Sequence, residues 1–353
     1  MKRALLALLL LAGELQAQEE FTAEVFLVKG QAEWQRPGEE AWQPLSVGQK
    51  IEEGSRIRTG KRSQVGLNLP GQMEMRIKSE SLFMLRPVEP GEEKLSVALV
   101  IGKLLARVAG SGGKPAFSVE TATAVAGVRG TVFSVAVAED STSLVAVDEG
   151  QVELMGEESL LLNPGQQAQQ EEGGRPELLP APVKISQWLK ERRQKALERR
   201  EQLLENLRKK AEETLEILRR GQENSRRLVA RMEKLEKNLQ RARRMGDERT
   251  VAETAEKFPA LVQELKEERG RMWKAVLVLE TRAALAKRLS EIGDNQELAK
   301  RLEEVNRNFK KLHQAINLSN RQLLHRMRQL IRLERAIWKN LGGPKVPPPE
   351  PKR

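Results

Sequence analysis

Residues Glu120–Val137 read ETATAVAGVRGTVFSVAV. Apolar and polar residues alternate before and after the central segment 127–131, and this period of two predicts β-strands whose two faces differ. Within the segment, Gly127 and Gly130 permit a positive φ or a close approach of the backbone. The stretch therefore predicts two strands joined by a tight corner, with Arg129 held between the two glycines.

The sequence around this stretch continues the same pattern. Short alternating runs recur between Phe21 and Leu162, and turn residues such as Pro37-Gly38 and Pro70-Gly71 separate them about every ten residues. No helical period lasts in this half of the chain. The pattern indicates an all-β sandwich, roll or short solenoid.

The corner and its neighbours also resemble a known family. GVRGTVFSVAV, followed by STSLVAVDEGQVEL and LNPGQQA, is similar to the FecR domain of bacterial envelope proteins, as is the upstream segment GQKIEEGSRIRTGKRSQVGLNLPGQMEMRI. The resemblance covers Val25 to Ala168 and implies a compact roll with solenoid-like stacking. It also implies a binding module, whose candidate binding residues are those of the corner: Gly127, Val128, Arg129, Gly130 and Thr131.

Arg129 has two interpretations. In the structural one, its guanidinium satisfies carbonyl groups or a carboxylate across the corner. In the functional one, it recognises an anionic group or a loop of a partner. The regulatory relatives implied by the resemblance have a cytoplasmic segment and a membrane span, and neither is expected here. Direct control of a sigma factor is therefore unsupported.

Catalytic chemistry is not expected in the β-rich half. No His or Cys occurs between Phe21 and Leu162, so no hydroxyl has an imidazole to activate it. Paired carboxylates such as Glu52-Glu53 lie in turn-like segments, where solvated surface charge is the ordinary explanation. His313 and His325 are too far apart for the i, i+4 pair of a helical metal site. We expect no enzyme activity, no catalytic residue, no metal and no cofactor.

The N-terminus predicts export. Met1-Lys2-Arg3 precedes an Ala/Leu run at 4–12 and a small residue at Ala17, which is the pattern of a cleavable signal peptide spanning residues 1–17. The alternative is a membrane anchor, but the apolar run is about half of the roughly 20 residues that a spanning helix needs. The chain has no Cys, so neither a lipoprotein anchor nor a disulfide framework is expected. We expect the periplasm or the cell envelope as the location.

Charge divides the chain into two parts. Residues 1–182 carry 18 Lys and Arg against 25 Asp and Glu, a net of −7, and residues 183–353 carry the remaining 43 against 25, a net of +18, which together give +11. Gly173-Gly174 and Pro180-Ala181-Pro182 mark the boundary. The predicted domains are a FecR-like β-domain at 21–168, a linker at 169–182 that lets the parts move, a helical domain at 183–341 and a proline-rich tail at 342–353.

The second half predicts an antiparallel helical coiled coil. Apolar residues recur at spacings of three and four along three segments, which begin near Leu197, Val251 and Leu298. Gly246-Asp247 and Gly293-Asp294 provide the ends and starts of consecutive helices. Pro259 should kink or restart the second helix. The fold class is therefore multidomain, with an all-β roll or solenoid followed by an antiparallel coiled coil.

The helical seam also contains charged and aromatic residues. Four charged residues fall on it and either set the register or extend from a loosely packed rim: Arg200, Glu268, Arg282 and Arg326. The tryptophans at 188, 273 and 338 are expected to anchor the packing near the ends of the helical arm.

The positive charge of the second half suggests partners. The charge is explained structurally if it belongs to a solvated face of the coiled coil. It is explained functionally if it binds an anionic lipid, an envelope polysaccharide or an acidic protein. Docking of the acidic β-domain is a further possibility, nucleic acid is not expected, and the coiled coil also permits a homo-oligomer. The sequence favours a non-enzymatic binding or scaffold protein of the envelope. The alternatives are a soluble accessory of a FecR-type transmembrane signalling pathway that regulates transcription, and a hydrolase.

Overall fold

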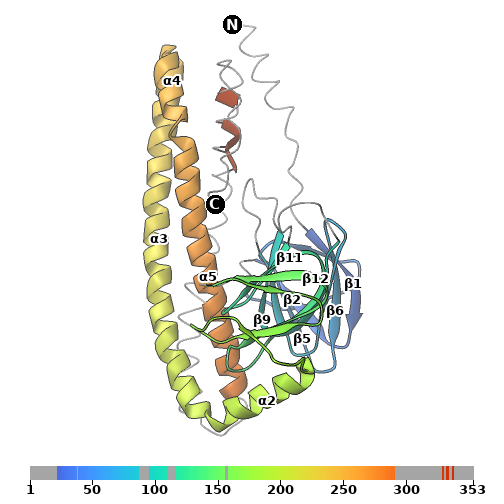
Figure 1. Cartoon of the computed structure of the whole chain (residues 1–353). Helices are drawn as coiled ribbons and strands as arrows, with labels where there is room; N and C mark the ends of the chain where they lie inside the picture. Colours follow the sequence, from blue (N-terminus) through green and yellow to red (C-terminus); the bar gives the residue numbers. More distant parts are fainter. Residues whose placement is uncertain are drawn as a thin grey trace.

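The computed structural model describes residues 22–37, 39–86, 95–109, 117–155, 158–290, 328–329, 331–333 and 336–337. The predicted signal peptide, the tail at 342–353 and most of the third helical segment lie outside these residues. Within the described residues, no helix combines the length and apolar character that crossing a membrane requires. A β-rich region is followed by long helices, as the sequence predicts (Figure 1).

Among the described residues, fifteen strands form one sheet whose main path runs β15-β14-β12-β11-β10-β9-β7-β6-β1-β4. The sheet is not closed, so the predicted roll or solenoid is not confirmed. The strands are β1 (Thr22–Lys29), β2 (Ala32–Gln35), β3 (Gln43–Pro44), β4 (Lys50–Glu52), β5 (Arg56–Thr59), β6 (Gln64–Leu69), β7 (Met73–Ile77), β8 (Leu82–Leu85), β9 (Leu95–Arg107), β10 (Phe117–Glu120), β11 (Val125–Val137), β12 (Ser143–Met155), β13 (Leu160–Leu162), β14 (Gln167–Gln170) and β15 (Glu177–Leu178).

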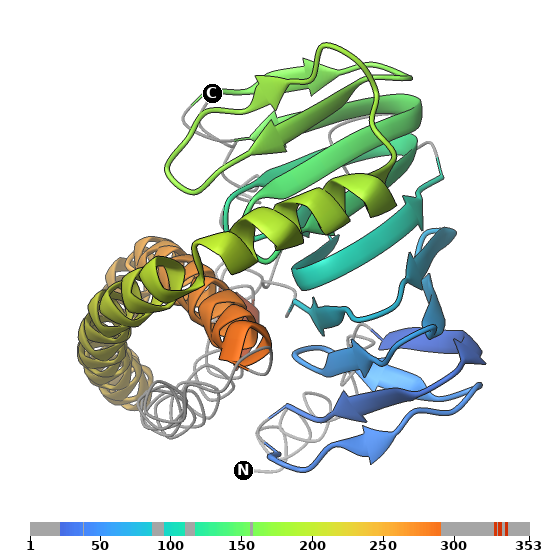
Figure 2. The ribbon, with the colours of Figure 1, turned by 90° about the horizontal axis from the view of Figure 1, so that it is seen from below.

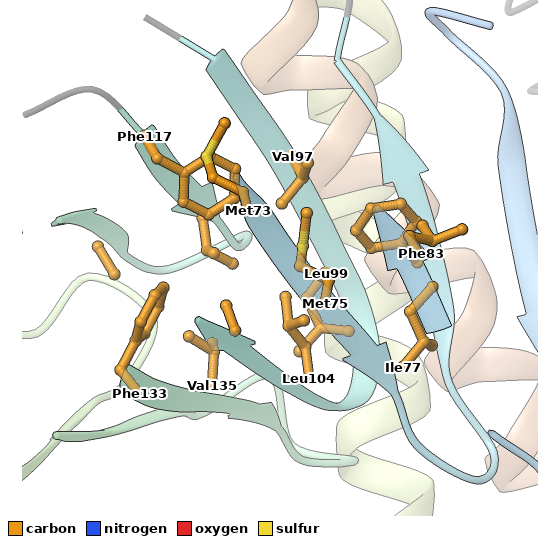
Figure 3. Packing of buried hydrophobic residues seen from close by; sticks show 14 of the residues in the cluster. Met73, Met75, Ile77, Phe83, Val97, Leu99, Leu104, Phe117, Phe133 and Val135 are labelled. Carbon is orange, nitrogen blue, oxygen red and sulfur yellow. The ribbon is translucent and has the colours of Figure 1, made fainter. Parts of the chain in front are cut away.

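Strand β9 joins the early and late strands of the sheet. Its first half pairs with β8 and runs parallel to β10, and its second half pairs antiparallel with β7 and β11. The inward side chains of these strands form one apolar core, in which Phe83, Phe117 and Phe133 are fully buried. Figure 3 shows this packing around Met75, Leu99 and their neighbours.

The predicted corner at 127–131 is wrong in its position. The chain turns earlier, where the Thr121 amide donates to the Ala124 carbonyl at 2.8 Å, and β11 then runs through the segment as one strand. The segment contains a β-bulge, because the pairing with β12 shifts between Arg129 and Val132. Of the two glycines that suggested a corner, Gly130 lies in this bulge with a φ of +62°, whereas Gly127 pairs regularly with Ser118 and Glu153. The predicted alternation after the bulge is confirmed, since Phe133 and Val135 are buried in the sheet core.

Between residues 158 and 290, which the structure describes without a gap, the sheet is followed by α2 (Ile185–Glu198), α3 (Arg200–Met245), α4 (Glu248–Ala255) and α5 (Phe258–Ser290). Gly246 ends α3 in the left-handed conformation and Asp247 caps α4, as predicted. The restart predicted at Pro259 is also confirmed, because α5 begins one residue earlier and accepts proline in its first turn.

Helices α3 and α5 pack as an antiparallel hairpin. Residues near the turn of the hairpin form one apolar cluster, and residues from the start of α3 meet the end of α5 in another. The twelve positions at this spacing from Val251 to Leu289 are all buried, which confirms the pattern in that segment: Val251, Thr254, Phe258, Leu261, Leu265, Glu268, Met272, Ala275, Leu279, Arg282, Ala286 and Leu289. A coiled coil in the strict sense is not confirmed. Of the third segment, the described Ile337 packs against the cluster near the turn.

Candidate functional site at the interface between the sheet and the helical hairpin

The sheet and the hairpin pack directly against each other, and α2 bridges them. Figure 2 shows α2 crossing the strands before it reaches the hairpin, and Figure 1 shows the sheet beside one half of that hairpin. Trp188 of α2 is buried against the outer face of β11 and β12, next to Ala136 and Leu144. The segment at 169–182 contributes β15, which pairs with β14, so part of the predicted linker belongs to the sheet.

An apolar patch on the outer face of the sheet forms the centre of the interface. In β9, Val97 and Leu99 point into the sheet core, whereas Ala98 and Val100 pack among helix residues that include Leu218 and Met272. This division follows from the alternation of side chains along a strand. Ile101 extends the patch toward the base of the hairpin, where it contacts the cluster formed by Leu204, Leu285 and their neighbours. Helix α5 therefore buries one face against α3 and another against β9 of the sheet.

A three-residue polar cluster lies beside this apolar patch. The indole Nε1 of Trp273 donates to a carboxylate oxygen of Glu120 at 2.8 Å, and Arg86 donates to the other oxygen at 2.6 Å. The Arg86 guanidinium also lies 6.0 Å from the centre of the Trp273 ring. Hydrogen bonds to a charged acceptor are among the stronger ones in proteins. The cluster therefore fixes α5 on the end of β10.

A second polar cluster joins both helices to the chain after β14. Arg282 is buried and donates to Glu172 at 2.7 Å, to the Lys210 carbonyl and to the Thr214 hydroxyl. Lys210 forms an ion pair with the same Glu172 at 3.1 Å. Burial raises the pKa of Glu172, but the hydrogen bonds and charges of Arg282 and Lys210 outweigh that effect, and the net pKa is lowered. The Glu172 carboxylate is therefore held in its charged form.

Two further ion pairs cross the interface. Arg288 donates to the Glu80 carbonyl and approaches the buried Glu139 at 3.5 Å. Burial lowers the pKa of Arg288, against the raising effect of the Glu139 charge. Arg56 of β5 pairs with the buried Glu280 of α5, so in this pair the cation is on the sheet and the carboxylate is on the helix.

The charges at this interface match the division of charge in the chain. Three carboxylates of the acidic part, Glu120, Glu139 and Glu172, meet donors on the hairpin helices α3 and α5. Of the two sequence expectations, independent movement and docking of the acidic domain on the basic arm, the structure has the docked arrangement. Arg282, which the sequence placed in the seam, donates hydrogen bonds to α3 within the hairpin and to Glu172 across the interface.

The predicted binding residues lie away from this interface, on β11. Gly127, Val128 and Thr131 are buried, and only Arg129 among the five is exposed. The Thr131 hydroxyl donates to the Gln151 carbonyl at 3.0 Å, and its backbone exchanges two hydrogen bonds with Val108. The segment therefore has a structural role as the bulge at which β11 changes its neighbour from β10 to β9. Binding at Arg129 stays a prediction.

The sequence did not identify most of the interface. Trp273 was expected near an end of the arm, but it lies in the middle of α5 and contacts the sheet through Glu120. The acidic partners come from turns or strand ends, where a carboxylate is ordinary. The charge contrast between the two halves was the signal that pointed to their docking.

Comparison with known proteins covers part of the chain. No curated protein matches it. The family model described as FecR protein matches residues 55–153, which run from the start of β5 into β12 and amount to well under half of the chain. The chain contains a FecR domain at residues 55–153.

Proposed function

We propose that this chain is an exported, non-enzymatic protein of the cell envelope, in which the FecR domain is a recognition module carried on a helical scaffold. The observation that carries the proposal is the interface itself. A sheet face that presents Ala98, Val100 and Ile101 is covered by the helices, and three carboxylates join the two parts at its rim. A recognition domain fixed in this way is held at a defined position relative to the projecting helices.

The helices suit the role of a spacer. At about 1.5 Å per residue, the 46 residues of α3 extend about 70 Å. The sheet lies beside one half of this length, and the other half projects beyond it (Figure 1). The absence of His and Cys between Phe21 and Leu162 supports a binding role over hydrolysis.

Export and recognition need separate tests. Expression of the whole chain in a Gram-negative host, followed by mass spectrometry of the periplasmic fraction, should yield a chain that begins at Gln18. A full-length chain confined to the cytoplasm would overturn the proposed location. Purified protein from residue 18 onward should then bind washed envelope fractions, and binding to neither membranes nor wall material would overturn the scaffold role.

The second candidate is a soluble accessory of a FecR-type signalling pathway, and the FecR match favours it. It predicts a change in transcription when the gene is deleted and recovery when the wild-type chain is returned. An unchanged transcript profile would exclude this candidate and leave the scaffold proposal standing.

A further inference from the structure

The end of the helical hairpin next to α4 contains more cations than carboxylates. The hairpin end consists of the last turns of α3 and the turn into α4, residues 237–249. It contains five cations against two carboxylates: Lys237, Arg241, Arg243, Arg244 and Arg249 against Asp247 and Glu248. The Asp247 carboxylate accepts from the amide and hydroxyl of Thr250, so it serves as a cap.

The arginines farther down α3 differ in this respect. Arg219 and Arg220 both pair with Glu216, and Arg227 pairs with Glu223 at 2.6 Å. At the hairpin end, Arg249 pairs with Glu253, whereas Arg241, Arg243 and Arg244 form no ion pair with any described residue. All three are exposed.

The helix dipole explains part of this pattern. Arg243 and Arg244 lie in the last turn of α3, where a positive charge is stabilised by the helix C-terminus. That effect is confined to the last turn, so it does not account for Lys237 and Arg241. Nor does it account for Met245, which follows the two arginines and has 71% of its surface exposed.

We propose that the hairpin end is a contact site for an anionic lipid surface. This inference rests on the proposed function, of which it names one partner. In the described residues, two antiparallel helices, the turn between them and the short segment around Ile337 form a narrow end, whereas a stable protein interface takes about 800 Å² from each partner. A bilayer presents a continuous layer of anionic headgroups and needs only a point of contact. The unpaired guanidinium groups suit the phosphates, and Met245 suits the apolar boundary beneath them.

The test is binding to vesicles. Protein from residue 18 onward retains every described residue and lacks the apolar leader, which would itself bind lipid. It is mixed with vesicles containing about 30% phosphatidylglycerol, or with neutral vesicles, at low ionic strength. The tip variant R241Q/R243Q/R244Q is compared with R219Q/R220Q/R227Q, which removes the same charge from ion-paired positions on the same helix.

We expect wild-type protein to bind the anionic vesicles and to dissociate as salt rises. Each cation near an anionic surface contributes about fivefold to partitioning, so the tip variant should bind about 100-fold more weakly. The matched control should lose much less. Met245→Ser should weaken vesicle binding a few-fold and leave binding to heparin, a polyanion without an apolar layer, unchanged.

Several results would overturn the inference. One is the absence of vesicle binding at low salt, and another is equal loss in the tip variant and its control, which would assign binding to the overall charge. Binding to heparin without binding to vesicles would replace the lipid with a soluble polyanion. Circular dichroism confirms that both triple variants keep their helices. Because this test uses purified protein, its failure leaves the result of the export test unaffected.

Discussion

Replacement of Trp273 by phenylalanine tests the polar cluster at the interface. The change keeps an aromatic ring beside Arg86 and removes the Nε1–H group that donates to Glu120 at 2.8 Å. The Glu120 side chain is only 12% exposed, so water replaces the lost donor poorly. A hydrogen bond to a charged group contributes roughly 1.5–3 kcal/mol, and Arg86 still satisfies one carboxylate oxygen. We expect Trp273→Phe to lower the free energy of unfolding by about 2 kcal/mol.

The matched control is Trp188→Phe, which makes the same chemical change at the other end of the interface. Trp188 donates to the neutral Gln169 side chain at 3.4 Å, which is a long and weak hydrogen bond. Its loss should cost below about 1 kcal/mol. The assay is urea unfolding of the whole chain, monitored by circular dichroism. Equal losses in the two variants, or a larger loss for Trp188→Phe, would refute the argument that the charged acceptor at Glu120 strengthens docking.

Three further predictions concern the hairpin, the bulge and pH. Gly221→Ala places a Cβ 2.8 Å from Met272 of the facing helix and should lower the melting temperature, whereas Gly270→Ala meets nothing within 4 Å and should stabilise by about 1 kcal/mol. Gly150→Ala forces a side chain onto a φ of +77° and to 2.3 Å from the carbonyl opposite in the bulge, so we expect a loss of at least about 2 kcal/mol in urea unfolding. Because the pKa of Glu172 is lowered from its ordinary value of 4.5, the charged carboxylate stabilises the folded chain at pH values above 4.5. The free energy of unfolding should therefore fall as the pH drops below 4.5, and Glu172→Gln should flatten this dependence when unfolding is measured as a function of pH.

The periodic elements of the fold were predictable from the sequence. The spacing of three and four between Val251 and Leu289 identified the buried face of α4 and α5, because a helix repeats every 3.6 residues whatever it packs against. The same holds for Gly246 and Asp247, whose backbone preferences end one helix and begin the next. The FecR domain was also identifiable, from the segment around the bulge.

The interface was not predictable in the same way. Helix α5 is buried on two sides. In the sequence, Val276 and Leu277 on its second face belong to an apolar stretch, and nothing in that stretch identifies the sheet as their partner. The bulge was misread as a corner because a glycine with positive φ serves either purpose, and only the pairing of β11 with its neighbours decides between them. A local sequence pattern does not show which distant strands will pair with each other.

The β-rich region and the hairpin form one docked unit, and the distance between two spin labels tests this arrangement. The chain has no Cys, so cysteines introduced at the exposed positions Val47 and Ile217 label only the turn between β3 and β4 and helix α3. A docked unit should give a single narrow distance distribution by pulsed electron spin resonance at neutral pH. A broad distribution, with the two labels sampling many separations, would contradict the docked arrangement.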